Sequence, residues 1–321
     1  MIKNFMKYYK PYMGILISVV IGTLLMAGFD LIFPVVVRNI IDEILPARDE
    51  IGLYKSAGLL LVLYLINFAV SYGVQYYGHI MSASIEHDMR NDLFAHIEKQ
   101  PFRYFDNEKT GQLLSRITSD VIEVSELAFR GPNDVLLCGI IMSGTIVAML
   151  IMSWQLALLV GGLLIAKSIH TVKINTQMKK AFRKNRAKTG ELSARAEESL
   201  AGIRLSKAFA MENFEMDRFR KKSEELRNTR FASYKILAYF SGSINFFTNF
   251  INVVVLLAGS YMIANGHLSL SDFVAFLLYV NIFMRPVFRL TILTEMYQRG
   301  MAGFGRFQEI MHIEPAIKDS P

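Results

Sequence analysis

The feature that most constrains this chain is a set of long stretches without Asp, Glu, Lys or Arg. They run over residues 12–29, 56–85, 135–166, 236–271 and 273–284. A helix that crosses a lipid bilayer needs about 20 consecutive apolar residues. The whole chain is 52% hydrophobic and 20% charged, whereas soluble domains carry about 25% charged residues. The sequence therefore predicts a membrane protein and argues against a soluble enzyme and a disordered chain. It also argues against a disulfide scaffold, because Cys138 is the single cysteine.

The apolar stretches predict six membrane spans. The 32-residue stretch 135–166 is too long for one span, and a polar and interfacial spot at Ser153, Trp154 and Gln155 divides it. The last two spans join through the turn-forming residues 264–267, with Ser271 as the expected N-cap of the final helix. The predicted fold class is an all-α membrane protein with six spans, near residues 13–37, 57–80, 134–153, 156–175, 236–263 and 272–294.

The distribution of Lys and Arg predicts the orientation. Of the 35 basic residues, 32 fall in the two termini, the two long loops and the ends of the spans beside them, and only three fall in the segment 38–56. Since basic residues collect on the cytoplasmic side, both termini and both long loops are expected in the cytoplasm. Basic loops that face anionic lipid or a cytosolic partner also account for the pI of 9.3, so no nucleic-acid partner is expected.

The two long loops, 81–133 and 176–235, are predicted to extend the spans as helices. Residues 81–100 contain no Gly or Pro, and apolar residues recur every four positions at Ile85, Met89, Leu93 and Ile97. A helix over residues 57–100 would be roughly 65 Å long at 1.5 Å per residue, about twice the bilayer's hydrocarbon core. Both loops are expected to end in short irregular tips, at 101–111 and 202–214, which would present a docking surface.

Both tips carry a motif. Residues 102–120 read FRYFDNEKTGQLLSRITSD, and residues 198–219 read ESLAGIRLSKAFAMENFEMDRF. These resemble the loops of type I, exporter-type ABC transporters, whose membrane domains commonly show FFDxxxTGxLxSRxxxD and GI[RK]x[VI]K[AS]FxxExxE. Ser206 departs from the second pattern, and Tyr104 stands in the aromatic pair of the first. The opening KYYKPY, the PxxRL at 286–290 and the tail RFQEIM extend the resemblance over nearly the whole chain.

The resemblance implies a domain-swapped dimer of six-span subunits, in which spans 4 and 5 reach across to a second copy or a paralogous half-transporter. The two tips would be coupling helices that dock on nucleotide-binding domains. Alternatively, the phenylalanines at 209, 214 and 219 pack against the loop's own helices. The residues expected at the docking surface are Glu108, Thr110, Gly111, Phe209, Glu212 and Phe214.

The sequence contains no P-loop of the form GxxxxGK[ST] and no ABC signature sequence. The resemblance therefore implies that residues 1–311 are the transmembrane domain and 312–321 the linker toward a missing nucleotide-binding domain. No cofactor is expected on this chain, since ATP and Mg would bind in that missing domain. No catalytic residue and no metal ligand is predicted, because the six histidines are scattered.

Polar and aromatic residues within the spans are the candidates for a substrate cavity. Arg285 and Arg289 lie four apart around Pro286, which should loosen the helix; alternatively both snorkel to headgroups. Amides in span 5 favour a polar interior, and aromatic walls suit amphiphilic substrates, although helix packing explains the same pattern. The predicted cavity residues are Asn245, Asn249, Asn252, Phe276, Tyr279, Phe283, Arg285 and Arg289.

Three functional hypotheses follow. The leading one is the translocation half of an ATP-driven exporter in a bacterial plasma membrane, moving drugs, lipids or peptides outward by alternating access. The second is an ion-gradient-driven permease that uses Asp30, Glu295 or His170 as proton carriers. The third is a membrane scaffold that transports nothing. Asp30 in span 1 is a candidate partner for Arg38. Lys167, His170 and Lys173 share a face at the inner end of span 4, where they are expected to snorkel.

Overall fold

The structure is a computed structural model that describes residues 5–313, and these residues form helices and short connections without a strand. Six long helices are each apolar enough to cross a membrane. Each predicted span falls on one of them, with only Ser153 outside helix, so the six-span prediction is confirmed. The six are α2 (Met13–Asn39), α4 (Glu50–Glu98), α7 (Val121–Met152), α8 (Trp154–Ala201), α10 (Glu212–Ala264) and α11 (Leu270–Met311).

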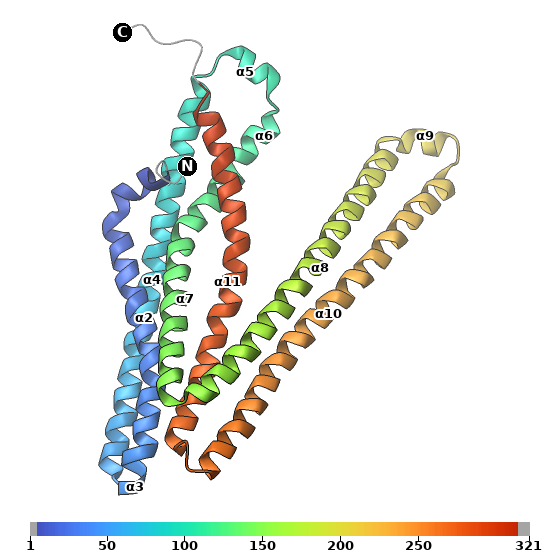
Figure 1. Cartoon of the computed structure of the whole chain (residues 1–321). Coiled ribbons are helices and arrows are strands. Elements are labelled where there is room, and N and C mark those ends of the chain that lie inside the picture. The colour runs from blue at the N-terminus through green and yellow to red at the C-terminus, as the bar shows by residue number, and fades with distance from the viewer. Residues whose placement is uncertain (1–4, 314–321) are drawn as a thin grey trace, which may run out of the picture. The chain divides into compact units, whose positions relative to one another are not determined.

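The helices divide into two compact units (Figure 1). Unit 1 contains the described residues up to Ser153 and from Asn265 onward, and unit 2 is Trp154–Ala264. Short elements complete unit 1: η1 (Lys7–Tyr12), η2 (Ile40–Ile44), α3 (Leu45–Ala47), α5 (Phe102–Asn107), α6 (Thr110–Ser115) and η3 (Arg116–Asp120). Unit 2 is the hairpin of α8 and α10 with α9 (Ile203–Ala208) at its tip.

The core of unit 1 lies in the predicted extension of span 2. Ile85, Met89 and Leu93 of α4 are fully buried, and Ile97 is nearly so, as the four-residue spacing predicts. They pack into one cluster with residues of α7 and α11, including Phe304. The helices therefore continue beyond the predicted spans as a packed bundle rather than as separate rods.

Two glycines bring α7 and α11 into backbone contact. A Cβ at Gly300 would lie 3.0 Å from the carbonyl oxygen of Glu123, and one at Gly303 would lie 3.1 Å from that of Asp120. Small residues permit such close helix packing in membrane proteins. Any larger side chain at either position would push the two helices apart.

The structure corrects three local predictions. The N-cap of α11 is Ser269, whose hydroxyl accepts from the backbone N–H of Asp272 at 3.0 Å; Ser271 instead donates to Asp42 at 3.1 Å. The tips are not irregular, because they contain α5, α6 and α9. Arg38 pairs with Asp272 at 2.7 Å rather than with Asp30. α11 also runs through Pro286 without a break.

Candidate functional site

The tip of unit 1 is formed by α5 and α6 (Figure 1). Thr110 and Gly111 open α6 and are exposed, and Glu108 is partly exposed in the link before it. Phe102, at the start of α5, is 91% exposed. Leu113 is buried in the core cluster and fixes α6 to the bundle. The tip therefore presents polar and aromatic groups on a fixed base.

A partly buried ion pair joins η3, which follows this tip, to the last helix. Both carboxylate oxygens of Asp120 accept from the Arg306 guanidinium, at 2.7 Å from Nε and 2.6 Å from an Nη atom. The Asp120 side chain is 11% exposed and that of Arg306 44%. The hydrogen bonds to Asp120 raise the pKa of Arg306. The pair therefore connects η3, and through it α6, to α11.

The tip of unit 2 exposes the predicted docking residues. Phe209 follows α9 and is 68% exposed, and Phe214 in the first turn of α10 is 53% exposed. Glu212 is exposed at the start of α10. The guanidinium of Arg218 lies 5.6 Å from the centre of the Phe214 ring, a cation–π contact. In this hairpin Phe209 and Phe214 are thus available for docking rather than packed inside.

Ion pairs join α8 and α10 behind this tip. Glu215 accepts from the Ser199 hydroxyl at 2.8 Å and from Arg195, and these contacts hold the pKa of Glu215 below its usual value. Further along, Lys188 and Lys222 both bind Glu191 and Glu225, at 2.8–3.3 Å. Glu215 belongs to the second motif, and in the structure it joins α10 to α8 within the hairpin.

The candidate cavity residues of unit 2 lie on α10. Asn245 and Asn249 are exposed beside Phe246 and Phe250, whose rings stack at 5.8 Å, and Asn252 is partly buried. These amides remain candidates for a substrate contact. Lys167 of α8 does not snorkel, because it is buried and its Nζ donates to Thr248 of α10 at 2.8 Å.

Three aromatic residues of α11 that were predicted to line a substrate cavity are buried in this structure. Phe276, Tyr279 and Phe283 are 0%, 2% and 7% exposed, and the Tyr279 hydroxyl donates to the carbonyl oxygen of Leu31 at 2.8 Å. Helix packing accounts for this burial, as the alternative explanation of their spacing expects. A contact of these three side chains with substrate stays a prediction.

The two arginines of α11 have different surroundings. Arg289 pairs with Asp134 of α7 at 3.3 Å, and Asp134 also accepts from Asn133 at 3.4 Å. Asn133 in turn accepts from Thr23 of α2. Asn133, Asp134 and Arg289 border a cavity of about 270 Å³ that Gln75 and Arg130 also line. Arg285 of α11 is exposed, and Asp30 of α2 is half-buried.

Sequence reasoning missed Asp134, Asn133 and Thr23. The available signal was weak: Asp134 stands directly before the charge-free stretch 135–166, where an acid needs a partner. The identity of that partner depends on packing between helices more than 100 residues apart in the chain. No cluster of three or more His, Cys, Asp or Glu that could hold a metal occurs within residues 5–313. Of the predicted linker 312–321, residues 314–321 lie outside the described residues.

One protein-family model and several curated proteins match this chain. The family described as the ABC transporter transmembrane region matches residues 15–287. The chain is 38% identical to the uncharacterized ABC transporter ATP-binding protein YwjA of Bacillus subtilis (strain 168), over 100% of this chain and 56% of YwjA. It is 30% identical to an ATP-dependent lipid A-core flippase of Desulfotalea psychrophila (strain LSv54 / DSM 12343), over 85% of this chain and 49% of the flippase.

A further relative is the putative multidrug export ATP-binding/permease protein YgaD of Bacillus subtilis (strain 168), which is 24% identical over 99% of this chain and 56% of its own length. The chain thus spans about half the length of the curated relatives it matches.

Proposed function

This chain belongs to the ABC transporter transmembrane family, and we propose that it forms the translocation half of an exporter that moves amphiphilic compounds out of the cytoplasm. It would pair with a second copy or a paralogous half-transporter. Nucleotide-binding domains that hold ATP and Mg would drive alternating access from the cytoplasmic side of a bacterial plasma membrane, where both termini would lie.

The two tips are the observation that carries this proposal. Each tip stands at the end of helices that continue well beyond a predicted span, and each exposes aromatic side chains such as Phe102 and Phe209. Exposed aromatics next to charge are typical anchors for a partner's groove. Each tip is also braced by ion pairs, Asp120–Arg306 in unit 1 and Arg195–Glu215 in unit 2. A braced tip transmits movement, which a coupling element needs.

The separation of the chain into two units supports an exchange of helices between subunits. Unit 2 contains predicted spans 4 and 5 with their cytoplasmic extensions, the part that the family resemblance assigns to the crossover. Its hairpin leaves many apolar side chains uncovered, among them Phe246 at 62% and Leu257 at 66% exposure. A second copy and the lipid would both be available to cover them.

The class of substrate follows from the relatives and from the polar groups in the spans. One relative is described as a lipid A-core flippase and another as a putative multidrug exporter. In this chain, amides alternate with aromatic rings on α10, and Arg285 and Arg289 carry charge on α11. Such a mixture of apolar and polar groups suits amphiphiles rather than small ions.

The test measures uptake of a fluorescent amphiphile by inside-out membrane vesicles from cells that produce this chain together with the nucleotide-binding domain that drives it. We expect uptake that requires ATP and survives an uncoupler. Phe209→Ala or Glu212→Ala should lower the amount transported per ATP hydrolysed several-fold. Phe231→Ala is the matched control, because Phe231 is a 62% exposed aromatic of α10, away from the tip.

Three outcomes would contradict the proposal. Uptake that an uncoupler abolishes while ATP is present would favour the gradient-driven permease, and Asp30→Asn would then be expected to stop it. Equal coupling in Phe209→Ala, Glu212→Ala and the control would remove the docking role of the second tip. A protein that transports no solute with any partner would fit the scaffold hypothesis.

A further inference from the structure

A large apolar cavity of unit 1 is lined in part by the N-terminal segment, and it shares no lining residue with the polar cavity beside Arg289. It has a volume of about 830 Å³ and is bounded by η1, the start of α2, α7 and α11. Its walls are almost entirely apolar, and they include Met6, Met13, Leu127, Leu293, Tyr297 and Met301.

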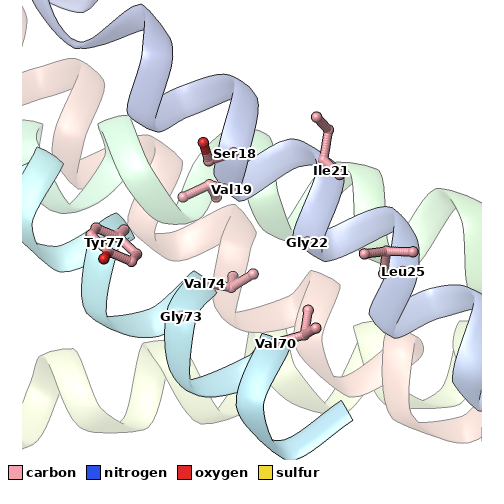
Figure 2. Close-up of a pocket in the computed structure, with 9 residues that line it drawn as sticks. All are labelled: Ser18, Val19, Ile21, Gly22, Leu25, Val70, Gly73, Val74 and Tyr77. Carbon is pink, nitrogen blue, oxygen red and sulfur yellow. The ribbon is translucent and has the colours of Figure 1, made fainter. Parts of the chain in front are cut away.

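The volume matches the hydrocarbon part of a membrane lipid. A water molecule takes about 30 Å³ in the liquid, and a methylene group takes a similar space. A cavity of about 830 Å³ therefore has room for most of two acyl chains. By the same reasoning, the groove between α2 and α4 in Figure 2, with about 330 Å³, holds only part of one chain.

The cavity is open and its walls are adaptable. Met6, Met13 and Tyr297 are 57%, 41% and 54% exposed, so a ligand can enter from the side without unfolding a helix. Methionine side chains are flexible and polarisable, and they adjust to chains of different shape. The groove of Figure 2 is lined mostly by branched aliphatic residues and by glycines, including Gly73, and contains no methionine.

Positive charge lies on the same short segment as part of the cavity wall. Lys7 and Lys10 are exposed, and each directly follows a residue that lines the cavity, Met6 and Tyr9. Segment 5–16 contains no acidic residue. The hydroxyls of Tyr8 and Tyr12 donate to Asp92 and Asp88 of α4, which holds η1 in place.

We propose that this cavity binds the acyl chains of an anionic phospholipid from the cytoplasmic leaflet, with its headgroup on Lys7 and Lys10. Lipid tails gain little by moving from bilayer to protein, because both surroundings are apolar. The headgroup therefore decides the selectivity. A basic residue near the surface contributes about 1 kcal/mol toward anionic lipid, which is about fivefold in affinity. The site is independent of what the protein transports.

The test uses the full protein in liposomes that contain photoreactive phosphatidylglycerol or phosphatidylcholine, each with a diazirine in one acyl chain. Mass spectrometry of the labelled peptides then measures where each probe attaches. We expect phosphatidylglycerol to label segments 5–16 and 290–301 more than phosphatidylcholine does, by about fivefold to 25-fold at low ionic strength. Lys7→Gln with Lys10→Gln should bring that ratio close to one.

A cavity-filling variant and a matched control separate this site from general lipid contact. Leu293→Trp should reduce labelling of both segments by either probe. Gly73→Leu narrows the groove of Figure 2, where a Cβ has no neighbour within 4 Å, and should leave the labelling unchanged.

Three results would overturn the proposal: equal labelling by the two probes in the unchanged protein, a loss of labelling in Gly73→Leu as large as in Leu293→Trp, or protection of both segments from both probes. The last would mean that a second copy of the chain covers the cavity. The lysine variant keeps the test decisive if Leu293→Trp fails to fold, because both lysines are exposed.

Discussion

The ion pair between Asp120 and Arg306 allows a sharp test of how the first tip is held to the bundle. Asp120→Asn keeps the shape of the side chain but removes the charge that two guanidinium N–H groups contact at 2.7 and 2.6 Å. The amide offers one acceptor in place of two and turns an amino group toward Arg306. The variant therefore removes the ion pair without creating a cavity.

The magnitude follows from the exposure of the two side chains. Removing one partner of a fully buried pair costs about 3–5 kcal/mol, whereas exposed pairs contribute about 0–1 kcal/mol. Asp120 is 11% exposed but Arg306 is 44% exposed, so the arginine regains water when its partner is lost. We therefore expect a loss of about 2 kcal/mol, between these two limits.

The chain offers a matched control three residues further along. Arg299 and Glu123 join α11 to α7, directly after η3, but at 3.4 Å and with side chains 57% and 33% exposed. Glu123→Gln should cost about 0.5 kcal/mol or less, as expected for a surface pair.

The assay is thermal unfolding of the purified protein in detergent, followed by circular dichroism. Asp120→Asn should lower the midpoint by several degrees and Glu123→Gln should barely change it. A double-mutant cycle with Arg306→Gln should give a coupling energy of about 1–2 kcal/mol. The reasoning is refuted if Asp120→Asn costs as much in the Arg306→Gln background as in the unchanged protein, since the loss would then not come from the pair.

Three further predictions concern packing and pH. Gly78→Ala should destabilise the protein by about 1–3 kcal/mol, because the new Cβ would overlap the ring of Phe129. Gly73→Ala is the control: a Cβ at Gly73 has no neighbour within 4 Å, so this variant should unfold like the unchanged protein. Tyr279→Phe should cost about 1 kcal/mol of unfolding free energy, because it removes the hydrogen bond to Leu31. It should leave amphiphile transport intact. A transport defect without a loss of stability would instead indicate that Tyr279 contacts the substrate. The pKa of Glu215 is lowered by its bonds to Ser199 and Arg195 from an ordinary value of 4.5, so this carboxylate stabilises the hairpin above pH 4.5 and the stabilisation is lost as the pH falls through the lowered pKa. Amide exchange around residues 195–215, corrected for its intrinsic pH dependence, should rise in that acidic range, and Glu215→Gln should remove most of the rise.

Much of the fold was accessible from the sequence because the signals are local. The break at Ser153 follows from a charge-free stretch that is too long for one span, and the turn after Ala264 follows from turn-forming residues. The helix continues to residue 98 because residues 81–98 contain no Gly or Pro. The buried stripe of Ile85, Met89 and Leu93 follows from a four-residue spacing. The N-cap was misplaced by two residues, since Ser269 and Ser271 satisfy the same local preference and only packing against Asp42 separates them.

The candidate site was accessible only in part. Motif residues predict a docking surface at the tips, and the structure exposes Phe209 and Phe214 there. The aromatic residues at 276, 279 and 283 share a helix face that is buried in this structure. Helical spacing identifies such a shared face but does not say what that face contacts.

The sequence by itself determined the number of spans, the length of their extensions and the position of the tips, because these depend on the chemistry of consecutive residues in one helix. Only the tertiary structure decided which charges meet. Arg38 joins Asp272, Arg289 joins Asp134, and Arg306 joins Asp120. The members of each pair are separated by more than 150 residues in the chain. Their pairing depends on how closely and in what register the helices pack, as at Gly300 and Gly303, and no local pattern encodes that geometry.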